Sequence, residues 1–291
     1  MFAKKTKMIK KLLFLCIALI SVSAIAQETH VPDDNFEQFL IDSGYDTGAL
    51  DDYVPTTNIK DITELDVHGK NITDLTGIED FLALKVLTVY NNQLTSLDVS
   101  KNIELENIFA TNNQIKTIDV TKNTKLTYLN LGNTGLSTID VTKNIALKYL
   151  HLQSNNLSTI DLSKNVGLLR LWLNHNKLSN LDLTNNRELT GLLKLEFNLL
   201  KNIDLSNNLK IESLYIKDNQ LENLDLSKNV KLIRLYVNNN PSLEALNVKN
   251  GNNTAILNYS SSNTPKLTCI QVDDAAWATA NWTNKDAATT Y

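Results

Sequence analysis

The sequence predicts a β-rich solenoid of the α/β type, with about nine coils of ~21 residues, parallel strands and a cap at each end. Three observations carry this prediction. A pattern of 21 residues recurs along most of the chain, its apolar residues follow the spacing of short strands, and the segments on either side lose the pattern. A period this regular decides the fold before any local propensity is considered.

The repeat is clearest in three consecutive copies. They read LTYLNLGNTGLSTIDVTKNIA (126–146), LKYLHLQSNNLSTIDLSKNVG (147–167) and LLRLWLNHNKLSNLDLTNNRE (168–188). Two copies begin earlier, at Leu84 and Leu105, and three looser copies are anchored at Leu193, Leu214 and Leu235. Apolar residues occupy positions 1, 4, 6, 11, 14 and 16, which no helical stripe fits, whereas the LxL and LDL triplets alternate as half-buried strands do. Stacked copies therefore bury their leucines in one core.

Two positions of the repeat are asparagine in almost every copy. Position 9 follows the first strand, where a side-chain amide can bond the free backbone groups of the turn and of the next coil. This set is Asn92, Asn113, Asn155, Asn176, Asn198, Asn219 and Asn240. Thr134 takes the place of asparagine in one copy, so we expect the ladder to be interrupted there. The second set, at position 19, is Asn102, Asn123, Asn144, Asn165, Asn186, Asn208 and Asn229.

From about Ile62 to Asn253, the pattern LxxLxLxxNxLxxLDLxxN resembles the leucine-rich-repeat family, in the nested bacterial form whose motif occurs twice per coil. The opening VPDDNFEQFL and the later NIKDITELDVHGKNITDLTGIEDF resemble the start of secreted leucine-rich-repeat proteins of Gram-negative bacteria and, more distantly, the internalins. The resemblance implies a leucine-rich-repeat solenoid with two strand sets per coil, on opposite sides, and few helices. It also implies binding through the strand face.

Residues 1–26 have the features of a secretory signal peptide. Five lysines precede the apolar run LLFLCIALISV, and Ala24-Ile25-Ala26 forms a small-x-small cleavage site. The alternative, an uncleaved anchor, is disfavoured because the run is short for a membrane span. Leu15 stands before Cys16 where a lipoprotein signal needs a small residue. We therefore expect an exported protein without a transmembrane segment, secreted or held at the cell surface, with the periplasm also open.

Charge and cysteine content exclude several classes of protein. The formal charge of −4 includes the five leader lysines, so the remainder carries −9 and has no basic stripe for nucleic acid. Cys269 is the one cysteine after the leader, which leaves no intrachain disulfide and no zinc spacing. The family resemblance implies a longer closing unit, often with a second cysteine, so the partner of Cys269 and the natural C-terminus stay open.

The segments at the two ends read as caps, residues 27–61 and 254–291, around a solenoid of residues 62–253. At the start, VPDDNFEQFLIDSG predicts a short helix with Asp33 or Asp34 as N-cap and Phe36, Phe39 and Leu40 on one face. Such a helix covers core leucines that the first coil leaves open. The acidic loop 46–52 reads as solvated, with calcium binding as the alternative.

At the other end we expect a Ser-rich loop, a strand at residues 267–272 and a short helix. Trp277 and Trp282 are expected to cover the last coil, with a ligand platform as the alternative reading. One coil is a residue longer than the rest, so a bulge is expected near Leu189–Gly191.

Outward-pointing residues of the first strand set form a stripe of aromatic and basic side chains. The candidate partner-binding residues are Tyr90, Phe109, Tyr128, Tyr149, His151, Arg170, Trp172, Lys194, Tyr215, Arg234 and Tyr236. Tyrosine, tryptophan and arginine dominate binding hot spots. The structural alternative is that aromatic residues favour strands and stack across coils.

The opposite face carries an aspartate at position 15 of seven coils, followed by Ser or Thr two residues on. A column of carboxylates about 4.8 Å apart repels itself unless lysines, turn N–H groups or cations relieve it. A calcium-binding or mineral-binding ladder is one reading. We favour turn chemistry, in which each aspartate accepts a hydrogen bond from the backbone two residues on.

No catalytic motif is present: the histidines lack metal-ligand spacing, and there is no nucleophile elbow or phosphate loop. His151 and His175 fall in successive coils, yet two histidines alone make no metal site. We therefore expect a non-enzymatic exported protein, without cofactor, that binds a protein partner in an adhesin-like or scaffolding role. A glycan-binding module and a passive spacer are the alternatives.

Overall fold

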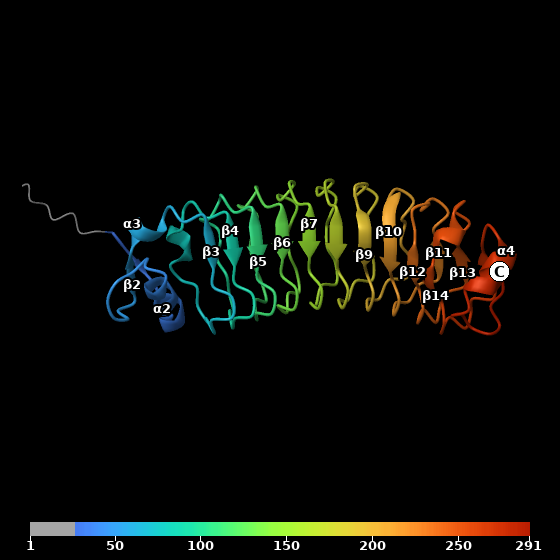
Figure 1. The fold of residues 1–291 in the computed structure, drawn as a ribbon, viewed down its shortest axis with the longest axis horizontal. Helices are drawn as coiled ribbons and strands as arrows, with labels where there is room; N and C mark the ends of the chain where they lie inside the picture. Colours follow the sequence, from blue (N-terminus) through green and yellow to red (C-terminus); the bar gives the residue numbers. More distant parts are fainter. Residues whose placement is uncertain (1–26) are drawn as a thin grey trace, which may run out of the picture.

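The computed structural model describes residues 27–291, so the predicted signal peptide lies outside the described residues. The chain winds into one long solenoid, and the strands of successive coils stack side by side along the molecule (Figure 1). A single ten-stranded parallel sheet runs along one face. Its strands are β3 (Glu64–Asp66), β4 (Val86–Thr88), β5 (Asn107–Phe109), β6 (Tyr128–Asn130), β7 (Tyr149–His151), β8 (Arg170–Trp172), β9 (Thr190–Lys194), β10 (Lys210–Tyr215), β12 (Arg234–Tyr236) and β14 (Asn258–Ser260). The predicted repeat solenoid is confirmed.

The strands stack in register, so each repeat position forms a straight lane along the molecule. Leu129 of β6, for example, pairs with Leu150 of β7, which pairs with Leu171 of β8. The leucines at these centres are buried and belong to one continuous core. Residues on either side of them point out of the sheet, as the two-residue period of a strand requires.

The asparagines at position 9 form the expected ladder beside the sheet. Asn113 Nδ2 donates to the carbonyls of Val89 in the preceding coil and Ala110 in its own, and its Oδ1 accepts from Leu94 N–H. The interruption at Thr134 is also present. Its hydroxyl donates to Leu131 O and is bonded to Asn155, but within the described residues no bond joins it to the preceding coil.

A second ladder, from the asparagines at position 19, lies fully buried on the other side of the core. Asn165 Nδ2 donates to Val141 O at 3.0 Å and to Asn144 O at 2.9 Å, both in the preceding coil. The same pair of bonds recurs from Asn123 to Asn229. Each coil is thereby bonded to its neighbour on two sides.

The second strand set is present only near the C-terminus, which corrects the expectation of two sets in every coil. β11 (Asn223–Asp225), β13 (Ala245–Asn247) and β15 (Ile270–Gln271) form a three-stranded parallel sheet. In earlier coils the same face is grooved: the 96–98 and 117–119 segments flank a hollow of about 600 Å³, and the 180–182 and 202–204 segments one of about 470 Å³. Neighbouring LDL triplets there are not paired as strands.

The expected bulge lies where one coil is longer. Gly191 in β9 has φ of 65°, and the register between β9 and β10 shifts between Ile211 and Ser213. The shift leaves Glu212 of β10 without a partner residue on β9, and the centres Leu193 and Leu214 remain paired.

The N-terminal cap consists of β1 (Glu28–His30), α2 (Asp34–Asp42), β2 (Tyr53–Pro55) and α3 (Thr56–Ile59), followed by the 3-10 turn η1 (Ile78–Asp80). Asp33, one of the two expected residues, is the N-cap of α2, and its Oδ1 accepts from the first backbone N–H groups of that helix. Its Oδ2 accepts from Thr73 N–H and Asp74 N–H. Phe36 of α2 is buried against Phe81 of the first coil. The helix therefore covers the open end of the core.

The C-terminal cap contains the short turn η2 (Asn253–Ala255), β14, β15 and α4 (Ala275–Asn281). Trp282 is 2% exposed, stacks on Tyr259 at 4.2 Å and donates from Nε1 to Ile256 O. This tryptophan covers the last coil as expected. Trp277 lies edge-on to it and is partly buried.

Candidate functional site

The long sheet presents ten of the eleven predicted residues directly, and Tyr90 follows the end of β4. The stripe is not uniform. A central group runs from Phe109 to Lys194, a second group lies at Tyr215, Arg234 and Tyr236, and Tyr90 stands apart, stacked on His68 at 4.6 Å. The structure thus brings ten of the predicted residues together on neighbouring strands of one face, where Tyr215 is paired with Lys194.

The aromatic rings of the central group pack on one another along the solenoid. Tyr128 lies between Phe109, at 4.8 Å, and Tyr149, at 5.3 Å. His151 stacks flat on Trp172, and Lys194 Nζ lies 4.7 Å from the Trp172 ring centre on the neighbouring strand β9. The faces of these aromatic rings therefore contact one another.

His151 was expected to project from the sheet, but it is only 5% exposed. Its Nδ1 is 3.1 Å from Tyr128 Oη. Burial, together with the positive charges of Arg170 and Lys194, lowers the pKa of His151 to about 4. The imidazole is therefore neutral at physiological pH, held between a phenol and an indole.

The cations of the stripe are not neutralised by the protein. Among the ion pairs of the described residues, none involves Arg170, Lys194 or Arg234. Arg234 instead donates a hydrogen bond to the Ser213 hydroxyl at 3.3 Å. Positive groups that stand free beside aromatic rings suit a partner that supplies carboxylates.

A further lane, at position 8, was not predicted as a feature. Each of its residues has positive φ, between 53° and 58°, where the chain turns away from the strand. They are Asn91, Asn112, Asn133, Ser154, His175, Phe197, Asp218, Asn239 and Asn263. Short side chains that tolerate this conformation, Asn above all, dominate the lane. The feature of the sequence that could have predicted this lane is the recurrent Asn-Asn pair after the strand.

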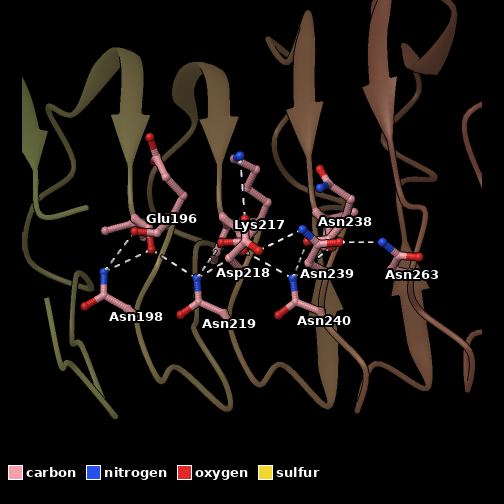
Figure 2. A network of polar contacts seen from close by, with 12 residues as sticks. Glu196, Asn198, Lys217, Asp218, Asn219, Asn238, Asn239, Asn240 and Asn263 are labelled. Carbon is pink, nitrogen blue, oxygen red and sulfur yellow. Dashed lines mark hydrogen bonds and ion pairs between the residues drawn. The ribbon is translucent and has the colours of Figure 1, made fainter. Parts of the chain in front are cut away.

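The asparagines of this lane bond one another from coil to coil. Asn112 donates to Asn91 and accepts from Asn133, and near the other end Asn239 donates to Asp218 and accepts from Asn263. Figure 2 shows part of this position-8 row, the outer row, with Asp218, Asn239 and Asn263. Beside it lies the inner row of position 9, with Asn198, Asn219 and Asn240. The outer row is broken in the middle, where His175 and Phe197 stack at 4.2 Å.

The aspartates of the opposite face follow turn chemistry. In each coil the Oδ1 of the aspartate accepts from the N–H two residues on, as Asp140 does from Thr142 at 2.8 Å. Hydrogen bonds from Thr142 hold the pKa of Asp140 below its usual range, and Ser100 does the same for Asp98. The self-repulsion of the column is thus relieved within each coil.

His151 and His175 do not meet, because each stacks on an aromatic ring of the next coil. Within residues 27–291, clusters able to hold a metal are confined to acidic side chains of the N-terminal cap around Glu37. The Glu37 carboxylate accepts from Asp51 N–H and Asp52 N–H, which ties the acidic loop to α2. In the same part of the chain no helix has both the length and the apolar character to span a membrane.

No family model matches the sequence. Internalin J of Listeria monocytogenes is 38% identical over 72 residues, a match that covers 24% of this chain and 8% of that protein. The solved functional domain of the same internalin, which includes a cysteine ladder, matches with a TM-score of 0.61 and 26% identity over 85% of this chain and 62% of that one.

Internalin F of the same species matches with a TM-score of 0.60 and 22% identity, covering 83% of this chain and 82% of that one. At this identity the likeness concerns the fold alone. The chain therefore spans a small part of the full internalin J sequence and about three-fifths of its functional domain. Both comparisons place the repeats among parallel solenoids of the same build.

Proposed function

We propose that this chain, whose repeats resemble those of the internalins, is a non-enzymatic exported binding protein which recognises a protein partner through its long sheet. The observation that carries the proposal is the joint placement of aromatic rings and free cations on that face. Arg170 and Lys194 flank Trp172, and Arg234 flanks Tyr236. Arginine and aromatic residues recur at the centres of protein interfaces.

The packing of the rings favours a protein over a glycan. A sugar ring binds an indole by lying on its face. His151 covers Trp172 at 4.0 Å, and Lys194 Nζ lies over the same ring at 4.7 Å. Tyr149 has Tyr128 stacked against it. What the stripe offers outward is ring edges and cations, which suit peptide groups and carboxylates.

The proposed role is adhesin-like or scaffolding, outside the cytoplasm. The leader-like residues 1–26 support export, and the comparison with internalin J supports a binding role. Release, attachment to the surface and residence in the periplasm are equally compatible with the sequence.

The test is a binding screen of residues 27–291 against envelope proteins, host-surface proteins and a glycan array. A Trp172→Ala, Tyr215→Ala double variant runs alongside. The matched control is Ile145→Ala, Val166→Ala, which removes two side chains that are 64% and 55% exposed at a different edge of the coil. A protein hit lost in the first variant and kept in the second supports the proposal.

A hit that survives in both variants moves the site away from the sheet and contradicts the proposal. A glycan hit lost in the first variant replaces it with the glycan-binding function. The absence of any hit makes a passive spacer the better account.

A further inference from the structure

One coil in the middle of the solenoid breaks the rule of the position-8 lane. Phe197 has φ of 56°, although a bulky side chain is disfavoured there, and it remains 38% exposed. Leu199, two residues on, is 42% exposed. His175 stacks on one side of Phe197, and Lys217 Nζ lies 4.7 Å from its ring centre. Two apolar side chains are thus kept in water, one of them at a strained position, which is typical of a functional surface.

The charge on the sheet changes sign along the molecule. Outward positions of β3 and the residue before β5 are acidic: Glu64, Asp66 and Glu106. In β8 and β9 they include Arg170 and Lys194, which make no ion pair within the described residues. Arg170 and Lys194 therefore form a basic zone on β8 and β9, in coils that also hold the buried carboxylate of Glu196, although residues 27–291 carry a formal charge of −9.

The same coils hold polar atoms that lack hydrogen-bond partners inside the described structure. They are His151 Nε2, Trp172 Nε1, Asn174 Oδ1 and Glu196 Oε2. The residues His151, Asn174 and Glu196 are 5%, 9% and 7% exposed. Atoms of the same kind occur in other coils, from Asn102 to Ser261, so the choice of these coils rests on Arg170, Lys194 and Phe197.

We infer that the coils bearing β7, β8 and β9 are the docking site for an acidic segment of a protein partner that carries an apolar side chain. The apolar side chain packs on Phe197 and Leu199, and carboxylates of the same segment pair with Arg170 and Lys194. This inference rests on the proposed function and specifies the chemistry of the partner.

The spacing of the groups favours a polypeptide over a small anion. Arg170 and Lys194 lie on adjacent strands, about 4.8 Å apart in the stacking direction, and Phe197 follows β9 by three residues. A single carboxylate or phosphate cannot reach both the cations and the apolar pair, whereas an extended peptide of a few residues can. A sulfated glycan would match the cations but has no apolar group for Phe197.

The test uses residues 27–291 and four probes: a glutamate–tyrosine copolymer, polyglutamate, a lysine–tyrosine copolymer and heparin. We expect the first to bind at least tenfold more tightly than polyglutamate, and the lysine copolymer not to bind. Arg170→Glu with Lys194→Glu should weaken the first probe at least tenfold. The matched control is Lys143→Glu with Lys164→Glu, the same charge change on the opposite side of the coil.

Phe197→Asn supplies a second, independent variant. It restores the residue that most coils have at this position, so it should melt at a higher temperature than the natural chain while weakening the glutamate–tyrosine copolymer several-fold. A loss of binding with raised stability cannot be attributed to misfolding. Unchanged binding in this variant and in Arg170→Glu, Lys194→Glu overturns the inference, as does equal weakening in the control pair.

Two further outcomes also overturn it. If heparin binds as tightly as the glutamate–tyrosine copolymer and its binding survives Phe197→Asn, the site is assigned to an anionic glycan. If the glutamate–tyrosine copolymer does not bind, an acidic segment is excluded as the occupant. The protein partner from the screen separates the two proposals. If its binding depends on Trp172 and Tyr215 but not on Arg170, Lys194 or Phe197, the proposed function stands and this inference fails.

Discussion

His151 and Trp172 lie face to face on β7 and β8, with ring centroids 4.0 Å apart and planes inclined by 3°. The contact buries an imidazole beside two free cations, Arg170 and Lys194. It gives the centre of the sheet a rigid aromatic platform and makes that platform sensitive to acid.

The stability of the protein should fall as the pH is lowered from 6.5 toward 4. The folded-state pKa of His151, about 4, is below the ordinary value of 6.5, so the unfolded chain binds more protons in this interval. The stabilisation is complete above pH 6.5 and is lost as the pH approaches 4, by about 2 kcal/mol after allowance for solvent screening. Urea unfolding midpoints across this range measure the effect.

The variant that isolates this effect is His151→Phe, which keeps a flat ring and removes the titrating group. Its unfolding midpoint should change less between pH 6.5 and pH 4 than that of the natural chain. His175→Asn is the control, because it leaves the His151–Trp172 contact intact. An equal pH dependence in His151→Phe and the natural chain would show that another group is responsible.

The buried ladder at position 19 should be costly to break. Asn165→Ala removes two hydrogen bonds from a fully buried amide and leaves the carbonyls of Val141 and Asn144 without them, so we expect a loss of about 2–4 kcal/mol. Asn156→Ala, at an exposed position in the same coil, should cost less than about 0.5 kcal/mol. Chemical denaturation of both variants decides whether burial makes the difference.

Repairing the interrupted ladder should stabilise the protein. In Thr134→Asn, by analogy with Asn113, the amide reaches Ala110 O and Ile115 N–H of the preceding coil. The gain expected is about 1 kcal/mol, reduced by the loss of the Thr134–Asn155 contact. A melting temperature at or below that of the natural chain would contradict this account of the ladder.

Gly77 should be the least replaceable glycine of the first coil. Its φ is 100°, and an added Cβ would lie 2.8 Å from His30 O and 2.9 Å from Val31 Cγ2. Gly77→Ala should therefore cost about 2–3 kcal/mol and loosen the N-terminal cap, which limited proteolysis would detect. Gly132→Ala is the control, because its Cβ would meet only the end of the flexible Gln153 side chain.

Asp33 should anchor the cap in a pH-dependent way. Burial raises the pKa of its carboxyl, but hydrogen bonds from Thr73, Asp74 and Phe36 outweigh burial and hold the pKa below 3.8. The stabilisation is present above pH 3.8 and is lost as the pH falls through the lowered value. Asp33→Ala should cost about 2 kcal/mol at pH 7 and less in acid, where the carboxyl of the natural chain becomes protonated, as measured by urea unfolding.

The fold could be predicted from the sequence because each coil repeats the same pattern of apolar and polar positions. The alternation around Leu129, Leu150 and Leu171 fixes which residues face the core, and stacking in register follows from identical coil length. The second strand set could not be predicted. Pairing between LDL triplets depends on the distance between coils on that face, and the residues of a single coil do not determine that distance.

The candidate site was predictable in position but not in detail. The two-residue period places Tyr149, Arg170 and Trp172 on the outer face of the sheet. It does not reveal that His151 is covered by its neighbours, because that depends on side-chain volume contributed by adjacent coils. Nor does it reveal the conformation of Phe197, which the turn imposes on whichever residue occupies position 8.

The three-stranded sheet of β11, β13 and β15 makes the two halves of the solenoid unequal in cohesion. Coils near the C-terminus are joined to their neighbours by β-sheets on both faces, whereas earlier coils have a β-sheet on one face and only the position-19 asparagine bonds and grooves on the other. Because repeat proteins unfold through interfaces between neighbours, opening should begin in the N-terminal half and spread. The C-terminal third would then be the last region to exchange its amide hydrogens.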